Sequence, residues 1–384
     1  MTLTRSAPAV RLGETDAVAG SRYRRDIEGL RAVAVLLVVL YHCGITLLPG
    51  GFVGVDVFFV ISGYLITGLL LRELRTRGTI SITGFYGRRV LRLLPAASLV
   101  IVTTVLASAW WLPSGRRQAV LLDALHTMGY AINFRLAAVG ADYLNADAVP
   151  SPLQHFWSLA VEEQFYLLWP PALLAITLIG RPAVSRLRTA LLVIVAGSFV
   201  LSVWQTTANP LWAYFGAHTR AWELGVGALL AFAPLDRLRP RAARSLGLLG
   251  LLAVLAAAVL FSATTAFPGS AALLPVAGAA AIIAGGIIAP SPLLVTAGMQ
   301  AIGRLSYSWY LWHWPALTIA PFVVGYDLAW WQNLAVAAGA FGAAALTYGL
   351  VENPARGLRK LRQTPWRAIV AGAAMTDAVS RCLA

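Results

Sequence analysis

Long apolar runs separated by short polar loops dominate the pattern along this chain. Runs of roughly eighteen to twenty-two residues, the length that an α-helix needs to cross a bilayer, recur between residues 30 and 352. A soluble domain would carry polar residues along every helix. The pattern therefore predicts an all-α polytopic membrane protein with about ten transmembrane helices, at residues 30–47, 51–71, 93–112, 156–179, 190–207, 212–233, 245–262, 271–289, 305–324 and 331–351.

One long polar segment, residues 113–154, follows the third apolar run. Its stretch 119–138 is weakly apolar and contains Asp123, Asn133 and Arg135. Counting this stretch as a transmembrane helix would move every later loop to the other side of the membrane. Because polar groups at membrane depth need protein partners, we predict a re-entrant or outer-face helix here, placed as a lid over a site.

Arginines gather in alternate loops between the predicted spans. Arg22, Arg24 and Arg25 precede the first span. The loops after the second, fourth and sixth spans are rich in arginine, with Arg72, Arg75, Arg77, Arg88, Arg89, Arg92, Arg181, Arg186, Arg188, Arg237, Arg239, Arg241 and Arg244. Loops rich in arginine stay on the cytoplasmic side. The N-terminus is therefore predicted to lie in the cytoplasm.

The composition agrees with a membrane protein. Hydrophobic residues make up 59% of the chain and charged residues 12%, about half the charged share of an ordinary soluble domain. The net charge of +14 does not indicate nucleic-acid binding, because the basic residues are spread among loops and form no single patch. Cys43 and Cys382 lie too far apart in sequence to suggest a disulfide framework.

We predict one membrane domain, residues 26–356, after a cytoplasmic tail at residues 1–25. No removable signal peptide is expected, since no small-residue cleavage site follows the first apolar run. Residues 357–384 are predicted to be a basic cytoplasmic segment with a truncated eleventh helix, because the apolar stretch from Trp366 meets Asp377 before it spans. No internal repeat of the kind found in many transporters is evident.

The first apolar run contains two ionisable residues, Arg31 and His42. Eleven residues apart on a helix, they lie about 20° apart around its axis and roughly 16 Å apart along it, so we expect them to face one groove. A neutral imidazole can take a proton from a hydroxyl, and a guanidinium can bind phosphate groups. Alternatively, His42 bonds a neighbouring carbonyl and Arg31 extends to lipid headgroups.

Carboxylates inside the apolar runs are functional candidates, because ionisable groups at membrane depth are costly. Asp56 either orients His42 or pairs with an arginine. His155 and Glu162 lie on one face of the fourth predicted helix, and Glu163 follows directly. An unpaired carboxylate there would take up a proton, so at least one is expected to be protonated or to pair with an arginine.

The sixth and ninth predicted helices add further polar candidates. Arg220 and Glu223 form an i, i+3 pair, either as a buried ion network with the carboxylates or as part of a substrate site. Trp312 and Trp314 lie in an aromatic stretch that is typical of interfacial anchors. His313 between them is either a ligand for sugar or acceptor, or an interfacial histidine with a local partner.

Six stretches follow one another along most of the chain: 24–42 (RRDIEGLRAVAVLLVVLYH), 51–66 (GFVGVDVFFVISGYLI), 85–95 (FYGRRVLRLLP), 155–170 (HFWSLAVEEQFYLLWP), 303–315 (GRLSYSWYLWHWP) and 352–354 (ENP). In this order they resemble the acyltransferase type 3 family of bacterial membrane O-acyltransferases. The resemblance implies a multi-pass protein of the bacterial cytoplasmic membrane. It also implies transfer of an acyl group, usually acetyl, from cytoplasmic acyl-CoA to a hydroxyl of a glycan, cell-envelope component or macrolide.

The resemblance also assigns roles to the candidate residues. His42 matches the family's proposed catalytic histidine, and Arg31 matches its companion at the acyl-CoA donor. The predicted catalytic group further contains Asp56, Glu162 and Glu163. The basic motif predicted to bind CoA phosphates contains Arg88, Arg89 and Arg92. The predicted substrate-binding residues are His155, Arg220, Glu223, Trp312 and His313.

One branch of this family continues into an extracytoplasmic SGNH-type domain, which the sequence does not show. It has no Gly-Asp-Ser motif followed by Asp-x-x-His. We therefore expect any second acyl-handling step to need a separate SGNH-type protein. No metal is expected, and the bilayer, acyl-CoA and a hydroxyl acceptor are the expected partners. The alternatives are a carrier or flippase for a polar lipid or glycan, and a scaffold without catalysis.

Overall fold

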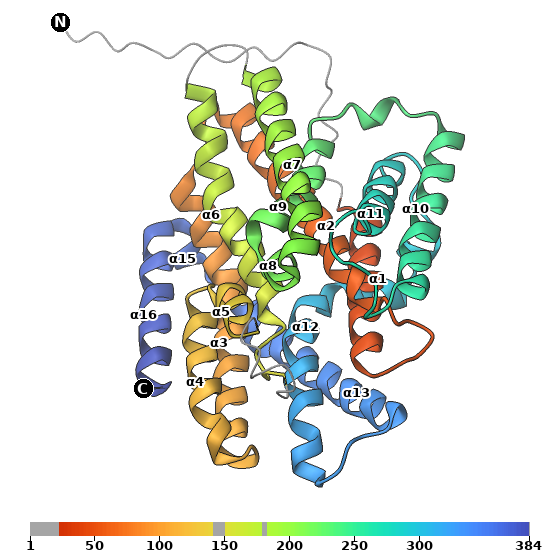
Figure 1. The fold of residues 1–384 in the computed structure, drawn as a ribbon. Helices are drawn as coiled ribbons and strands as arrows, with labels where there is room; N and C mark the ends of the chain where they lie inside the picture. The colour runs from red at the N-terminus through yellow and green to blue at the C-terminus, as the bar shows by residue number, and fades with distance from the viewer. Residues whose placement is uncertain (1–22, 141–149, 179–182, 384) are drawn as a thin grey trace, which may run out of the picture.

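The computed structural model describes residues 23–140, 150–178 and 183–383. Within these ranges the chain is helical and forms no strand, as the sequence predicts. The helices pack side by side in one bundle (Figure 1). Shorter helices join the longer ones, and the bundle encloses a buried interior.

The α-helices have the following bounds: α1 Arg25–His42, α2 Gly54–Arg77, α3 Ile82–Trp111, α4 Ser114–Met128, α5 Ile132–Gly140, α6 Phe156–Leu178, α7 Ala183–Ala208, α8 Pro210–Phe215, α9 Ala217–Leu230, α10 Pro240–Leu260, α11 Leu273–Gly286, α12 Ala297–Val324, α13 Trp330–Thr347, α14 Asn353–Gly357, α15 Arg359–Gln363 and α16 Pro365–Leu383. Short 3₁₀ helices cover Gly51–Val53, Leu235–Arg237 and Leu293–Val295. A π-helical turn, Tyr348–Glu352, joins α13 to α14.

Five helical stretches of the described chain are long and apolar enough to cross a membrane. They are Gly51–Arg77, Ile82–Trp111, Ser185–Ala208, Pro240–Leu260 and Trp330–Gly357. The predicted total of about ten stays a prediction. Helix α1 is not among these five stretches, because its 18 residues include the charged Arg25, Asp26, Glu28 and Arg31.

Residues 212–233, predicted as one helix, belong to two helices that meet at Gly216. The backbone of Gly216 is extended, with φ −73° and ψ 130°, and its N–H donates to the Trp212 carbonyl at 2.9 Å. A Cβ on Gly216 would lie 2.4 Å from that carbonyl oxygen, so a side chain does not fit the turn. The break ends α8 and starts α9, which carries Arg220 and Glu223.

The polar segment predicted as a re-entrant or outer-face helix forms two helices, α4 and α5. Helix α4 runs back beside α3 (Figure 1), and α5 packs against α6 and α8. Asp123, Asn133 and Arg135, the polar residues on which the prediction rests, have protein partners, as expected at membrane depth. Arg135 Nε donates to Asp123 Oδ1 at 2.6 Å, and Asn133 Nδ2 donates to the Phe215 carbonyl at 3.1 Å.

Glycines bring α2 and α9 into close contact. A Cβ on Gly63 of α2 would lie 1.8 Å from the Leu224 carbonyl oxygen, and one on Gly227 of α9 would lie 2.0 Å from the Val60 carbonyl oxygen. Small residues permit this close approach between membrane helices. The contact fixes Asp56, near the start of α2, against the polar residues of α9.

Helix α16 packs along α3 and also touches α4. It begins at Pro365, one residue before the predicted start of the last apolar stretch at Trp366, and continues as a helix through Asp377 and Arg381. These two side chains form an exposed ion pair at 3.0 Å. A helix therefore exists where a truncated eleventh helix is predicted, and the predicted domain boundaries stay predictions.

Candidate active site

A cavity lined by arginines opens at the end of the bundle where α1 begins. Its volume is about 570 Å³, and Glu28 is its one lining carboxylate among the described residues. We call this space the basic cavity. The arginines come from the segment before α1 and from α1, α3, α12, α14 and α15, and are Arg24, Arg31, Arg88, Arg92, Arg304, Arg356 and Arg362. Such a cluster suits an anion with several oxyanion groups.

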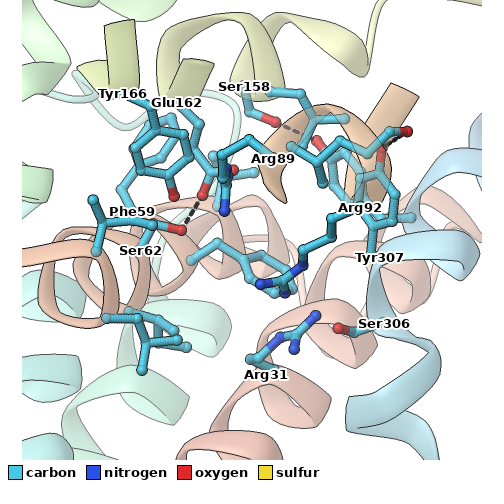
Figure 2. A pocket seen from close by; sticks show the side chains of 18 residues that line it. Arg31, Phe59, Ser62, Arg89, Arg92, Ser158, Glu162, Tyr166, Ser306 and Tyr307 are labelled. Carbon is cyan, nitrogen blue, oxygen red and sulfur yellow. Dashed lines mark hydrogen bonds between the residues drawn. The ribbon is translucent and has the colours of Figure 1, made fainter. Parts of the chain in front are cut away.

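A second, smaller cavity of about 100 Å³ continues inward from the basic cavity. The two share Arg31, Leu65 and Arg92 as lining residues. Figure 2 shows Arg31 of α1 and Arg89 and Arg92 of α3 reaching into this space. Its other walls are mainly apolar and aromatic and include Phe58, Phe59, Leu159, Tyr166, Tyr307 and Tyr310. We call it the inner cavity.

Two neighbouring carboxylates of α6 support the arginine side of the inner cavity. Glu163 Oε1 accepts from Arg89 Nη2 at 2.9 Å, and the Arg89 guanidinium lies 4.0 Å from the centre of the Tyr166 ring. Glu162 lines the cavity and accepts a hydrogen bond from the Ser62 hydroxyl (Figure 2). The structure therefore brings Glu162 and Glu163 to the arginines, and their predicted catalytic role stays a prediction.

The arginines of α3 differ in how fully they are paired. Arg88 Nη2 lies 3.4 Å from Glu73 Oε2 of α2, and Glu73 also pairs with Arg77 at 3.2 Å. Arg92 Nε is buried and has no hydrogen-bond partner among the described residues. Because buried polar groups are normally hydrogen-bonded, this donor beside both cavities points to a ligand that would satisfy it.

Three histidines meet beyond the far wall of the inner cavity. His42 ends α1, His313 lies in α12, and His155 directly precedes α6. His42 Nδ1 and His313 Nε2 are 3.0 Å apart, and the two rings are inclined by only 14°. The ring centres of His155 and His313 are 5.7 Å apart, and Trp314 lies 4.4 Å from His42. We call these three residues the histidine cluster.

Tyr310 lies between the inner cavity and the histidine cluster. Its side chain lines the inner cavity. Its hydroxyl is 2.7 Å from Ser158 Oγ and donates to the His155 carbonyl at 3.0 Å. Its own backbone carbonyl accepts from His313 Nδ1 at 2.7 Å. The tyrosine thus touches the cavity with one end and the histidines with the other.

Arg31 and His42 do not share one open groove. Arg31 lines both cavities, whereas His42 is a lining residue of neither of these two cavities as the described residues form them. Val35 and Val38, between them on α1, are buried in a cluster that also contains Phe59 and Tyr310. The expected alignment along α1 is present, but apolar side chains and Tyr310 separate its two ends.

Asp56, Arg220 and Glu223 form a buried ion network. Arg220 Nη1 lies 3.2 Å from Asp56 Oδ1 and 2.8 Å from Glu223 Oε1, and the three side chains are at most 1% exposed. Four aromatic rings surround the guanidinium, those of Phe59, Trp157, Tyr214 and Phe267. These contacts match the ion-network alternative. The predicted catalytic role of Asp56 and substrate-binding roles of Arg220 and Glu223 stay predictions.

The predicted substrate residue Trp312 points away from the histidine cluster. Its Nε1 donates to Thr347 Oγ1 of α13 at 2.9 Å, and its ring lines an apolar groove between α3 and α12. Trp314, two residues later, is the tryptophan beside His42, with ring centres 4.4 Å apart. Its Nε1 donates to the Ser151 carbonyl at 2.8 Å. Substrate binding by Trp312 stays a prediction.

Sequence reasoning missed Tyr310, Trp314, Arg304 and Arg356 as site residues. Helical spacing held a signal for Tyr310, because positions three and four apart share a face. Tyr310 stands three residues before His313, and Tyr307 stands three residues before Tyr310. Arg356 is held by Glu352 at 2.7 Å, and Glu352 also accepts from Ser308 at 2.6 Å. That arrangement depends on the π-helical turn, which the sequence did not indicate.

Comparison with known proteins identifies relatives of this chain. A family model described as an acyltransferase domain matches residues 24–349. The chain is 35% identical over 354 residues to the peptidoglycan O-acetyltransferase OatA of Listeria monocytogenes, an alignment covering 87% of this chain and 56% of OatA. It is 33% identical over 354 residues to the putative peptidoglycan O-acetyltransferase YrhL of Bacillus subtilis, covering 87% and 55%. The chain thus spans about half the length of these two relatives.

A third relative is matched over nearly its full length. The chain is 31% identical over 368 residues to the putative membrane-bound transacylase BcsY of Komagataeibacter xylinus, covering 94% of this chain and 89% of that protein. No solved structure matches the chain. The family match includes the segment before α1, the arginines of α3, both glutamates of α6 and the histidine cluster.

Proposed function

The chain belongs to the family of acyltransferase domains, and we therefore propose that it transfers a short acyl group from acyl-CoA to a hydroxyl of a cell-envelope glycan. Acetyl is the acyl group that we propose. One observation carries the proposal. A basic cavity continues into a small inner cavity, and Tyr310 at its far wall is bonded to the His313 that faces His42. The names of OatA and YrhL support acetyl as the group and peptidoglycan as a candidate acceptor.

The basic cavity has the chemistry that the donor needs. Coenzyme A carries phosphate groups at one end, and arginines bind phosphate oxygens through paired N–H donors. Arg31 and Arg92 lie where the two cavities meet. We assign the phosphates to the basic cavity and the thioester arm to the inner cavity. The predicted donor-binding residues are Arg31, Arg88, Arg89 and Arg92, and the basic cavity adds Arg24, Arg304, Arg356 and Arg362.

The size of the inner cavity favours a short acyl chain. Its volume of about 100 Å³ is several times the roughly 10–15 Å³ that a cavity needs to hold one water molecule. A thioester with a two-carbon acyl group is of this order, whereas a long fatty acyl chain is not. The aromatic wall of Phe58, Phe59 and Tyr310 closes the space beyond.

His42 is the proposed base. It takes the proton of the acceptor hydroxyl as that oxygen attacks the thioester carbonyl carbon, and the C–S bond breaks. The thiolate of CoA then receives the proton from His42. In an alternative route, His42 attacks the thioester carbonyl carbon, so that an N–C bond forms as the C–S bond breaks. The acceptor oxygen then attacks the acyl group, the N–C bond breaks, and the hydroxyl proton again ends on CoA. Either route requires Tyr310 and the apolar side chains before His42 to rearrange, because they separate His42 from the inner cavity.

We place the basic end of the bundle in the cytoplasm of a bacterial inner membrane. The ends of α2 and α6 and the start of α10 lie at one end of the molecule (Figure 1). Their arginine-rich sequences favour the cytoplasmic side. The histidine cluster then lies toward the outer face, where the glycan acceptor is found. A separate SGNH-type protein stays a candidate for any later acyl transfer.

The test is acceptor-dependent release of CoA. Purified protein in liposomes is incubated with radiolabelled acetyl-CoA, with and without soluble peptidoglycan fragments. We expect free CoA and labelled glycan to form together, and only when both substrates are present. A carrier without acyl chemistry would leave acetyl-CoA intact with every acceptor tried, and that result would reject the proposal.

A further inference from the structure

We propose that His313 is a positioning residue that fixes the tautomer of His42, so that His42 Nε2 is the nitrogen available for chemistry. The inference deepens the proposed function and rests on it for its catalytic meaning. Its structural content does not, because the tautomer of His42 is measurable without any transfer reaction.

The first step is to assign which ring nitrogen of neutral His313 carries the hydrogen. Its Nδ1 lies 2.7 Å from the Tyr310 carbonyl oxygen. A carbonyl oxygen can only accept a hydrogen bond, so Nδ1 carries the hydrogen. In a neutral imidazole the other nitrogen then has a free lone pair. His313 Nε2 is therefore an acceptor.

The second step passes this assignment to His42. His42 Nδ1 lies 3.0 Å from His313 Nε2. Because His313 Nε2 accepts, His42 Nδ1 must donate and carries the hydrogen. The lone pair of a neutral His42 then lies on Nε2. A base or nucleophile at His42 acts through that atom.

The opposite arrangement requires a buried cation. His313 would have to donate from both nitrogens and carry a positive charge. Its side chain is 0% exposed, and the groups facing the pair are Tyr310, His155, Trp314 and Tyr41. None of these four supplies a carboxylate, and a buried charge without a counter-ion is costly.

Pro315 explains how His155, the third member of the histidine cluster, is oriented. Pro315 has no N–H, so the Leu311 carbonyl four residues earlier lacks its usual helical donor. His155 Nε2 lies 3.1 Å from that oxygen and fills the place. Two backbone carbonyls of α12, those of Tyr310 and Leu311, thus orient two histidines. The aromatic stretch of α12 thus positions His313 against His42.

The proposed chemistry follows without further groups. His42 Nε2 takes the hydroxyl proton while Nδ1–H stays bonded to His313 Nε2, which stabilises the resulting imidazolium. The new C–O bond forms, the C–S bond breaks, and the proton passes to the CoA thiolate. His313 touches no substrate in this scheme and acts through His42.

Two substitutions separate the two hydrogen bonds of His313. In His313→Gln the side-chain amide reaches the position of Nε2 and can present an oxygen to His42. In His313→Asn the shorter amide reaches only the position of Nδ1, so His42 loses its acceptor. We expect the Gln variant to keep transfer within about tenfold of the wild-type rate. We expect the Asn variant to lose about 10²–10⁴-fold, the usual contribution of a positioned base.

Nitrogen-15 NMR on protein labelled at its histidines, of which the chain has 5, gives the independent readout. His42→Gln identifies the His42 signals by their loss. We expect His42 to be protonated at Nδ1 in the wild type and in His313→Gln. His42 protonated at Nε2 in the wild type would overturn the inference, as would a His313→Asn variant that transfers at the wild-type rate.

The two proposals fail in different ways. Wild-type protein with the expected tautomer and no acyl transfer would refute the proposed function and leave the tautomer assignment standing. Normal transfer with the other tautomer would refute this inference alone. The tautomer readout compares wild-type protein with folded His42→Gln protein and needs no transfer activity.

Discussion

Arg92 lies where the basic and inner cavities meet, and its buried Nε lacks a partner among the described residues. We expect Arg92→Ala to raise the KM for acetyl-CoA about 10- to 100-fold with a smaller change in kcat. A hydrogen bond to a charged group contributes about 1.5–3 kcal/mol, and each 1.4 kcal/mol is about tenfold in affinity. Steady-state kinetics in liposomes measures the change.

Arg244 provides the matched control for Arg92. It is an exposed arginine of α10 and lines neither cavity. Arg244→Ala should leave the KM unchanged, although it removes the same charge. Equal effects of the two substitutions would show that the basic end acts through its overall field and that the assigned phosphate site is wrong.

Substitutions of Asp56 and Arg220 test whether the ion network of Asp56, Arg220 and Glu223 is structural or catalytic. Arg220 pairs with two carboxylates, so Arg220→Leu leaves both without a cation, whereas Asp56→Asn leaves Arg220 paired with Glu223. Removing one partner of a buried ion pair costs about 3–5 kcal/mol. We expect thermal unfolding in detergent to show a larger loss for Arg220→Leu than for Asp56→Asn. Folded Asp56→Asn protein without any transfer activity would contradict the structural role.

Contacts between side chains on different helices could not be predicted from the sequence. Arg31 and His42 were identifiable because both interrupt one apolar run. The partner of His42 was not identifiable as such, because His313 is 271 positions away and spacing along one helix carries no information about contacts with another. The ion-pair partner of Arg220 could not be identified from the sequence either. Whether Arg220 pairs with Asp56, Glu162 or Glu163 depends on how α2 and α6 pack around α9.

At the scale of the elements, the contact between α2 and α9 depends on glycines. We expect Gly63→Ala to lower the melting temperature, because its Cβ would lie 1.8 Å from the Leu224 carbonyl oxygen and backbone would have to move. Gly68 of the same helix has open space at that position. Gly68→Ala should be neutral or stabilising, since alanine favours a helix over glycine by about 1 kcal/mol.

The melting temperatures of Gly63→Ala and Gly68→Ala are measured by thermal unfolding under identical conditions. Equal melting temperatures would show that α2 and α9 are not in close contact.

The helices themselves were largely predictable, because apolar periodicity marks helices. The break at Gly216 was not predictable, since residues 212–233 read as one apolar run and the extended backbone there is set by the turn between α8 and α9.

At the scale of the whole molecule, the proposed orientation predicts which loops are accessible from each side. In a background with Cys43 and Cys382 replaced, a cysteine at exposed Arg241, at the start of α10, should react with an impermeant maleimide only after the cells are opened. A cysteine at exposed Thr264, between α10 and α11, should react in intact cells. The reverse pattern would invert the orientation and place the basic cavity outside, away from acyl-CoA.

The central claim is that acyl groups delivered through the basic cavity are transferred at His42. The most direct measurement compares wild type and His42→Ala for transfer of radiolabelled acetyl from acetyl-CoA to a glycan acceptor in liposomes, with acetyl-CoA binding and thermal unfolding measured on the same samples. We predict unchanged binding, a similar melting temperature and a loss of transfer of at least about 10²-fold. A folded His42→Ala variant that transfers acetyl at the wild-type rate would contradict the account.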